Sequence, residues 1–461
     1  MKKKSISTHD LIRWLIYSLV IMVPVIYHTG FNAAFTTPKL TLLRIVSLLI
    51  VLVWGVQILA QKRFSYRSSP LNKWIIGYGV VLSLATLFST YFWVSFFGDQ
   101  GRFLGLMTML NLLFLLVVVM TFFQSKHDIH RFIRISVWTA VALSIYGLLQ
   151  FKGLVGAENW DYDPTLRVFG TFGHSNHFGA YLAFHVMLLA GMFLNTRRSW
   201  YKAACGLAVV PMFAAILATA SRGAFFSLVG AALIFSAALL YHRRHWMYQR
   251  RKKIGAGIVA LLIFVAIFNK PLIDRFNNLN LTKRTVSTIE FMMDGNIPDR
   301  VSWWFSSLAM VRDKPVFGFG LSTFRDNYNL YRRTDYRVPF DVQDTVTPES
   351  AHMEYFNIAT TQGLVGLIIY LGLIICWARL LFRVMRDKEG SIKKKITAVS
   401  LFAAGLVYFL QVLMSFGVVG TLVPLYLLLG ASVTYYHVTS DPVPQSKQFK
   451  NIKFGGGTAL I

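Results

Sequence analysis

The chain has 461 residues, of which 55% are hydrophobic and 15% are charged, and its mean hydropathy is +0.51. In ordinary soluble domains about a quarter of the residues are charged, so this composition excludes a typical soluble protein. The formal net charge of +27 would suit a nucleic-acid-binding protein, but most of the excess lies in short segments between apolar stretches. Membrane topology explains such a distribution, and we expect no nucleic-acid partner.

Twelve apolar stretches of membrane-spanning length follow one another along the chain. Backbone groups in a bilayer core must be hydrogen bonded internally, so apolar stretches of about 17 to 25 residues predict transmembrane helices. The predicted spans are 11–27, 40–60, 74–97, 103–123, 132–151, 177–195, 203–220, 224–241, 254–268, 364–381, 397–416 and 419–438. The sequence therefore predicts an all-α, polytopic integral membrane protein with about 12 transmembrane helices.

Lysine and arginine are concentrated in every second connection between these spans. Cytoplasmic loops of membrane proteins carry such an excess. The basic connections include the N-terminal Lys2, Lys3 and Lys4, the six basic residues of 243–253, and the segment 383–395. An even number of spans fits this alternation, so we predict that both termini are cytoplasmic.

This topology divides the chain into four parts. Residues 1–268 hold predicted transmembrane helices 1 to 9, and residues 364–438 hold helices 10 to 12. Between them, residues 269–363 form one large extracytoplasmic loop, and residues 439–461 form a cytoplasmic tail. Connections of this length are uncommon without a function, so we expect the large loop to carry the catalytic segments.

Two features are predicted near the middle of the large loop. Trp303, Trp304 and Leu308 recur at helical spacing within 299–311, which predicts an amphipathic helix at the membrane surface. The glycines of 318–320 predict a turn. They do not form a phosphate loop, because no strand precedes them and no Lys-Ser or Lys-Thr pair follows.

A second helix is predicted near the end of the loop. Thr347 is suited to cap its N-terminus, and Pro348 is suited to its first position. His352 would then lie in the first helical turn, where unpaired amide groups favour a neutral imidazole that can accept a proton. A lone histidine at a membrane surface is more often structural, so the assignment of His352 as a base depends on the residues around it.

Two arginines stand in unusual places. Arg222 lies in a very short connection between two apolar stretches, where a guanidinium needs an anionic partner or a route by which it snorkels to water. Arg167 begins the glycine-containing segment 167–176, in which small residues permit close approach of the backbone. Both arginines are candidates for binding an anion.

Several segments together resemble the O-antigen ligase and polymerase superfamily of bacterial polysaccharide assembly. The resemblance covers roughly 167–370. It is carried, in order, by 167–172 with Asn176, by 221–224, by Asp299 and Arg300 with Trp304, by 315–320, and by 351–355 followed by 363–366. Met353 departs from the family, which usually has asparagine after the histidine, and this puts the preference for a particular acceptor in question.

The resemblance implies a multi-pass enzyme of the bacterial cytoplasmic (inner) membrane. Such proteins transfer a glycan from undecaprenyl pyrophosphate to a hydroxyl of a glycan, lipid or protein acceptor at the outer face. On this reading Arg222 and Arg300 bind the pyrophosphate, with help from Arg167 and Arg102, because arginine offers a bidentate fork to phosphate oxygens. His352 takes the proton from the acceptor hydroxyl, and direct displacement inverts the anomeric configuration. No cofactor is expected.

Two other functions, and the presence of a metal site, remain open on the sequence alone. A repeat-unit polymerase would use the same donor chemistry with a second lipid-linked glycan as acceptor. A transporter of lipid-linked glycans would also suit twelve spans with both ends inside. Asp161 and Asp163 have a spacing that some glycosyltransferases use to bind a divalent metal, but such pairs are common in polar loops, and we expect no metal.

Overall fold

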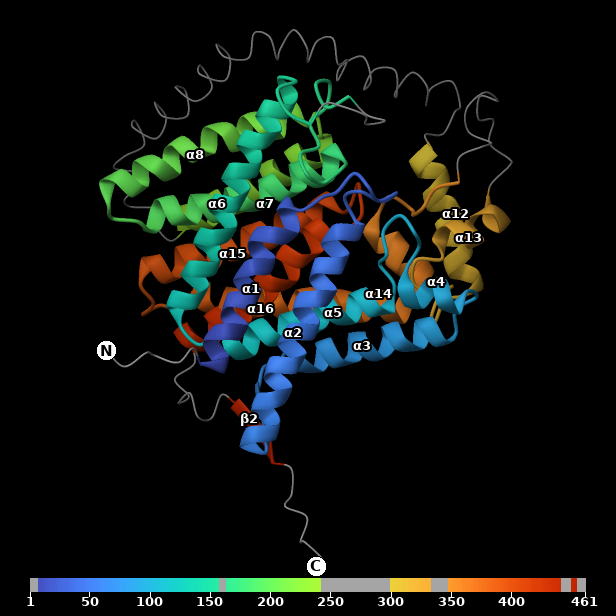
Figure 1. Ribbon diagram of the computed structural model, residues 1–461, viewed down its shortest axis with the longest axis horizontal. Coiled ribbons are helices and arrows are strands. Elements are labelled where there is room, and N and C mark those ends of the chain that lie inside the picture. Colours follow the sequence, from blue (N-terminus) through green and yellow to red (C-terminus); the bar gives the residue numbers. More distant parts are fainter. Residues whose placement is uncertain (1–6, 157–162, 242–298, 333–346, 441–448, 454–461) are drawn as a thin grey trace, which may run out of the picture.

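The structure is a computed structural model that describes residues 7–156, 163–241, 299–332, 347–440 and 449–453 (Figure 1). Helices make up most of it. In chain order the elements are α1 Thr8–Val25, α2 Thr37–Gln61, β1 Arg63–Arg67, α3 Asn72–Leu87, α4 Phe92–Phe97, α5 Leu106–Phe122, α6 Lys126–Phe151, α7 Ser175–Asn195, α8 Ser199–Ala218, the helix Arg222–Tyr241, α12 Asp299–Asp313, α13 Phe324–Tyr328, η1 Asn329–Tyr331, α14 Glu354–Arg386, α15 Ile392–Gln411, α16 Val419–Ser440 and β2 Phe449–Lys453.

Eight of the described helices are long and apolar enough to cross a membrane, namely α1, α2, α6, α7, α8, Arg222–Tyr241, α14 and α16. The predicted multi-pass helical architecture is therefore confirmed, whereas the count of twelve spans stays a prediction. The predicted span 254–268 lies outside the described residues. Helix α16 is buried along almost its whole length, while α2 and Arg222–Tyr241 leave most of their apolar surface exposed, as expected of helices that face lipid.

The connections between helices fall into two sets, because each connection contacts others at the same end of the helices. We call the two ends the first end and the second end. In the first set Arg13 at the start of α1 forms an ion pair of 3.1 Å with Asp128 at the start of α6. In the second set Arg102, between α4 and α5, donates a 3.0 Å hydrogen bond to Ser350, just before α14. Basic connections belong to the first set, in agreement with the alternation that the charges predict. Helices α4, α12 and α13 gather at the second end, at the right of Figure 1.

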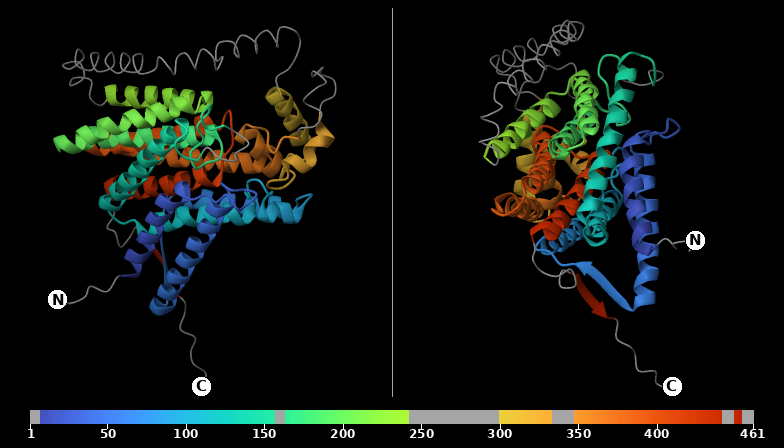
Figure 2. Two further views of the ribbon diagram at one scale, coloured as in Figure 1. Left: turned by 45° about the horizontal axis from the view of Figure 1, so that its top comes forward. Right: turned by 90° about the vertical axis from the view of Figure 1, so that its left-hand side faces the viewer.

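A small sheet modifies the all-α expectation. Strand β1, directly after α2, pairs antiparallel with β2 of the C-terminal tail, with Arg63 opposite Lys453 and Ser65 opposite Asn451 (Figure 2). The guanidinium of Arg67, at the end of β1, is buried and donates to carbonyls at the end of α5. Because paired strands must lie on the same side of a membrane, the pairing agrees with placing this connection and the tail together.

Two predicted spans differ from the helices in the structure. The span 74–97 is divided into α3 and α4, because Ser89 and Thr90 between them both donate hydrogen bonds to the carbonyl of Phe319 in the large loop. The span 397–416 ends early, since α15 stops at Gln411. Helices α3 and α15 both end where the chain approaches the large loop. The two differences therefore mark the end of the bundle at which that loop is attached.

Helix α14 is also interrupted, at Gly363, where φ is 71°. The large loop crosses the helix there, and a Cβ on Gly363 would lie 2.0 Å from the crossing backbone. The N–H groups of Phe319 and Gly320 donate to the carbonyls of Thr360 and Thr361, which the interruption frees. Irregular backbone in a membrane protein persists only where such partners exist. The predicted glycine turn is thus confirmed, and it fixes the first part of α14 at the second end.

Candidate active site

His352 lies in the loop before α14. The prediction of a helix that starts at Pro348 is wrong, because α14 begins at Glu354 and His352 has a left-handed conformation with φ of 51°. Ser350 explains the difference: its Oγ accepts hydrogen bonds from the His352 N–H (3.2 Å) and from Arg102 (3.0 Å), which stabilise a turn in place of a helix. Strained backbone at a non-glycine residue is a feature of functional sites.

Two aromatic rings hold the imidazole of His352. The ring centroid of Trp303 lies 4.8 Å away at an interplanar angle of 33°, and that of Phe416 lies 5.1 Å away at 73°. Trp303 belongs to α12, whose next residue, Trp304, donates from its indole nitrogen to the carbonyl of Ala351 at 3.1 Å. The predicted helix is therefore confirmed, and its two tryptophans contact the histidine loop. Its position at the membrane surface stays a prediction.

The environment of His352 keeps its imidazole neutral. Burial lowers the pKa of His352 to about 3, and the positive charges of Arg300, Arg102 and His174 act in the same direction. Neither ring nitrogen forms a hydrogen bond with another of the described residues. The imidazole is thus neutral near pH 7 and has a nitrogen free to accept a proton.

Arg102 is buried against the histidine loop, with 8% of its surface exposed. Its Nε lies 3.3 Å from a carboxylate oxygen of Glu349, and its Nη2 donates to Ser350. Its guanidinium carbon lies 3.5 Å from the centroid of the Phe416 ring. Arg102 therefore joins three neighbours of His352 to one another. The structure shows these contacts with the histidine loop, and the predicted help of Arg102 in substrate binding stays a prediction.

We call the other three predicted arginines, Arg167, Arg222 and Arg300, the arginine corner. Arg300 is close enough to His352 and His174 to lower the pKa of each, and Arg167 lowers the pKa of His174. Arg300 lies in the first turn of α12 and donates to a backbone carbonyl of the segment between α15 and α16 at 3.1 Å. Arg167 donates to the carbonyl of Thr219 at 3.2 Å. Arg222 is exposed at the start of its helix and lies close enough to Arg300 to lower the pKa of that guanidinium, although burial lowers it more.

Within the described parts of the chain, no carboxylate pairs with Arg222 or Arg300. Positive charges held close together without acidic partners repel one another, and an anion bound between them would relieve this repulsion. The planar guanidinium groups can each bind two phosphate oxygens. The corner is therefore suited to a ligand with several negative charges.

Two histidines that the sequence analysis did not select also belong to the site. His174 accepts a hydrogen bond from the N–H of Asn176 and so caps α7. Burial and the charges of Arg167 and Arg300 lower the pKa of His174 to about 4. His177 packs against both His174 and Phe416, with ring centroids 5.2 and 5.1 Å away. The only available signal was the occurrence of two histidines in the glycine-containing segment after Arg167.

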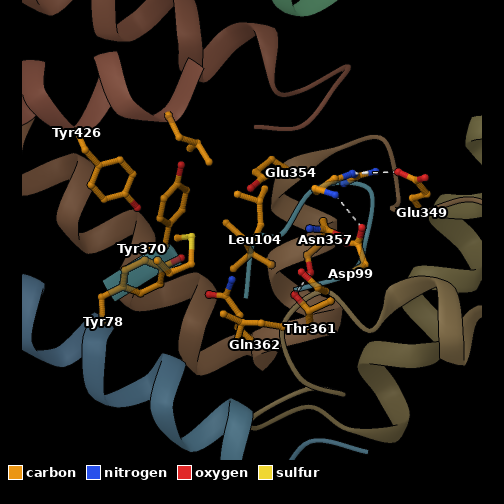
Figure 3. A pocket seen from close by; sticks show the side chains of 16 residues that line it. Tyr78, Asp99, Leu104, Glu349, Glu354, Asn357, Thr361, Gln362, Tyr370 and Tyr426 are labelled. Carbon is orange, nitrogen blue, oxygen red and sulfur yellow. Dashed lines mark hydrogen bonds and ion pairs between the residues drawn. The ribbon is translucent and has the colours of Figure 1, made fainter. Parts of the chain in front are cut away.

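A polar cavity of about 40 Å³ extends from Arg102 into the helices (Figure 3). Asp99, Glu349 and Asn357 lie at one side of it and a group of tyrosines lies at the other, with Glu354 between them. A single water needs roughly 10–15 Å³, so the cavity is large enough for water but too small for a sugar ring. A substrate larger than water would therefore lie outside this cavity, next to His352 and the arginine corner.

The predicted acidic pair is only partly described. Asp161 lies outside the described residues, and Asp163 accepts hydrogen bonds at 2.8 and 2.7 Å from the backbone and hydroxyl of Thr165 in a local turn. Among the residues that the structure describes, no group of three or more His, Cys, Asp or Glu side chains is placed to hold a metal ion. The expectation of a metal-free reaction stays a prediction.

Comparison with known families gives one match. Residues 207–371 match the family model described as O-antigen ligase. This match agrees with the resemblance to the O-antigen ligase and polymerase superfamily and covers about a third of the chain. It includes Arg222, Arg300 and His352, whereas Arg102 and Arg167 precede it. No curated protein sequence matches the chain. The chain is thus a multi-pass helical protein with membrane-length apolar helices and a segment similar to O-antigen ligases.

Proposed function

We propose that the protein transfers a glycan from undecaprenyl pyrophosphate to an acceptor hydroxyl at the outer face of the cytoplasmic membrane. The observation that supports this proposal is the position of a neutral histidine with a left-handed backbone near Arg300, which in turn lies near Arg222. Glycosyl transfer from a lipid pyrophosphate needs both a base for the acceptor and cations for the leaving group.

The arginine corner binds the donor pyrophosphate in this mechanism. Negative charge grows on the leaving pyrophosphate as the glycosidic bond breaks, and guanidinium groups fixed in advance stabilise that charge. Arg222 is exposed and Arg300 is anchored by one backbone hydrogen bond, so both retain donors for phosphate oxygens. Arg167, which is held against Thr219, assists from the edge of the corner.

His352 acts as the general base. Its free imidazole nitrogen accepts the proton of the acceptor hydroxyl while the oxygen attacks the anomeric carbon, and the bond to the pyrophosphate breaks on the opposite face. One displacement of this kind inverts the anomeric configuration. Bound pyrophosphate would also offset the positive charges of Arg300 and Arg102, which raises the pKa of His352 at the moment when a stronger base is needed.

Purified protein in vesicles that contain a lipid-linked oligosaccharide tests this function. The assay offers separate acceptors, namely a lipid A core oligosaccharide, a serine-containing peptide and a second lipid-linked unit, and identifies products by mass. We expect a joined product with the native chain and none with His352→Ala. Product formed on the second lipid-linked unit alone would assign the protein as a polymerase, and product on either other acceptor would assign it as a ligase.

The same vesicles distinguish catalysis from transport. Donor on the outer leaflet is measured in parallel with product. The proposal is contradicted if the native chain moves lipid-linked glycan across the bilayer, joins it to no acceptor, and loses that movement in both His352→Ala and Arg222→Lys.

A further inference from the structure

A second basic site lies at the opposite end of the bundle from His352. A cavity of about 340 Å³ opens there between α6, α7 and α15. We call it the basic pocket, and the residues that define it are Lys126, His130, Arg134, Asn195, Lys393 and Lys394. None of the described residues that line it is acidic. The charge pattern predicts that this end faces the cytoplasm.

Two lysines of the basic pocket lie at the N-terminus of a helix, where positive charge is unfavourable. Lys393 and Lys394 belong to the first turn of α15, which contains no acidic residue. The N-terminus of a helix carries partial positive charge, so cations are unfavourable there and an anion is favourable. Only Lys394 has a carboxylate partner among the described residues, an ion pair with Asp387. Lys393 is exposed and has no carboxylate partner among the described residues, so it is available to an anionic ligand.

The other walls of the pocket supply further donors. Lys126 and Arg134 are exposed, and no described carboxylate pairs with either. Asn195 is fixed to α15 by hydrogen bonds from its amide nitrogen to Lys393 (3.2 Å) and Thr397 (2.8 Å). Its Oδ1 atom is buried without a partner in the described structure. Helices α6 and α15 thus present cationic groups to the same space, and Asn195 of α7 lines it.

Apolar residues complete the pocket on the side toward the bundle. Leu188 and Met192 of α7 and Ile133 of α6 line it below the charged groups. A free inorganic anion gains nothing from such a surface, whereas a lipid can place its glycerol backbone and first methylenes against it. Basic pockets between transmembrane helices on the cytoplasmic side are typical sites for anionic lipid headgroups.

We infer that the basic pocket binds a phosphate group and that the headgroup of an anionic phospholipid supplies it. The phosphate lies between Lys126, Arg134 and Lys393. The bound lipid would join the ends of α6, α7 and α15.

The test compares two double variants that remove the same charge. Lys126→Gln with Lys393→Gln removes two lysines of the pocket, and Lys388→Gln with Lys395→Gln removes two nearby lysines that do not line it. Full-length protein in phosphatidylcholine nanodiscs is titrated with phosphatidylglycerol, and bound lipid is counted by native mass spectrometry. We expect the pocket variant to bind phosphatidylglycerol about 30-fold more weakly and the control variant to bind it as the native chain does.

The alternatives give different results in the same experiment. Equal loss in both variants would assign the binding to general surface charge and overturn the site, as would equal binding in all three proteins. Inorganic phosphate is added in a separate arm. If it displaces phosphatidylglycerol from the native chain at similar concentration, the lipid source is wrong. The elution of each variant on size exclusion in phosphatidylcholine, unchanged from the native chain, shows that the loss does not come from unfolding.

Discussion

The arginines around His352 fall into two groups that differ in their partners. Arg102 is buried and paired with Glu349 at 3.3 Å, while Arg222 and Arg300 have no carboxylate partner among the described residues. A paired guanidinium fixes the loop that it contacts, whereas one without an acidic partner attracts an anion. The difference indicates that residue type alone does not assign a role, and that these arginines should fail in different ways when they are replaced.

Replacement of His352 should have the largest effect. General base catalysis typically contributes about 10² to 10⁴ in rate, so His352→Ala should lower the single-turnover rate by that factor. Donor binding should persist, because the arginine corner is untouched. His127→Ala is the control, since it removes an exposed imidazole at the opposite end of the bundle. Equal loss of rate in both variants would mean that His352 has no special function.

Replacement of Arg300 should weaken donor binding. Arg300→Lys keeps the charge but loses the fork, and charged hydrogen bonds of this kind correspond to about 10-fold to 100-fold in affinity. Arg312→Lys, in the last turn of the same helix, is the control. Affinity is measured with a fluorescent analogue of the lipid pyrophosphate. Unchanged binding by Arg300→Lys would remove this residue from the donor site.

Replacement of Arg102 should have a smaller effect of another kind. Arg102→Lys keeps the positive charge near Glu349 but loses the second contact with Ser350, so the loop that carries His352 becomes less well fixed. We expect kcat to fall about 10-fold with donor affinity retained. Glu349→Gln should give a similar loss, and the double variant should be little worse than either single variant. Weaker donor binding in Arg102→Lys would show that Arg102 binds the donor together with the arginine corner.

The pH dependence should show the smallest and most specific effect. Protonated His352 cannot accept a proton, so activity is lost as the pH falls through its pKa. In the free protein that pKa is about 3, and bound pyrophosphate should raise it by about 1 unit or more. The acidic limb of kcat should therefore lie at higher pH than that of kcat/KM for the donor. Coincident limbs would show that the donor does not act on His352.

Patterns in the sequence were sufficient for most of the long helices. Hydropathy indicated the spans that the membrane-length helices occupy in the structure, and the spacing of Trp303 and Trp304 indicated α12. Local patterns failed where distant segments supply hydrogen bonds. The cap pattern at Thr347 favoured a helix, but Arg102, far away in the chain, stabilises a turn through Ser350. No local rule could show that contact.

The sequence also did not show that Arg102 and Arg300 have different partners. Arg102 and Arg300 are both single arginines near apolar segments, and only the fold brings Glu349 to one of them. The strands β1 and β2 were missed for a related reason, because two five-residue strands that are far apart in the chain carry little periodic signal. What the sequence left open was which segments meet.

The most direct test of the account measures donor affinity and single-turnover rate together in His352→Ala and Arg300→Lys. We predict that His352→Ala binds the lipid pyrophosphate analogue as tightly as the native chain and transfers almost no glycan. Arg300→Lys should bind it at least about 10-fold more weakly and lose rate as well. If both variants bind the analogue normally, or if His352→Ala loses binding while Arg300→Lys retains it, the division of the site into a base and an anion-binding corner is wrong.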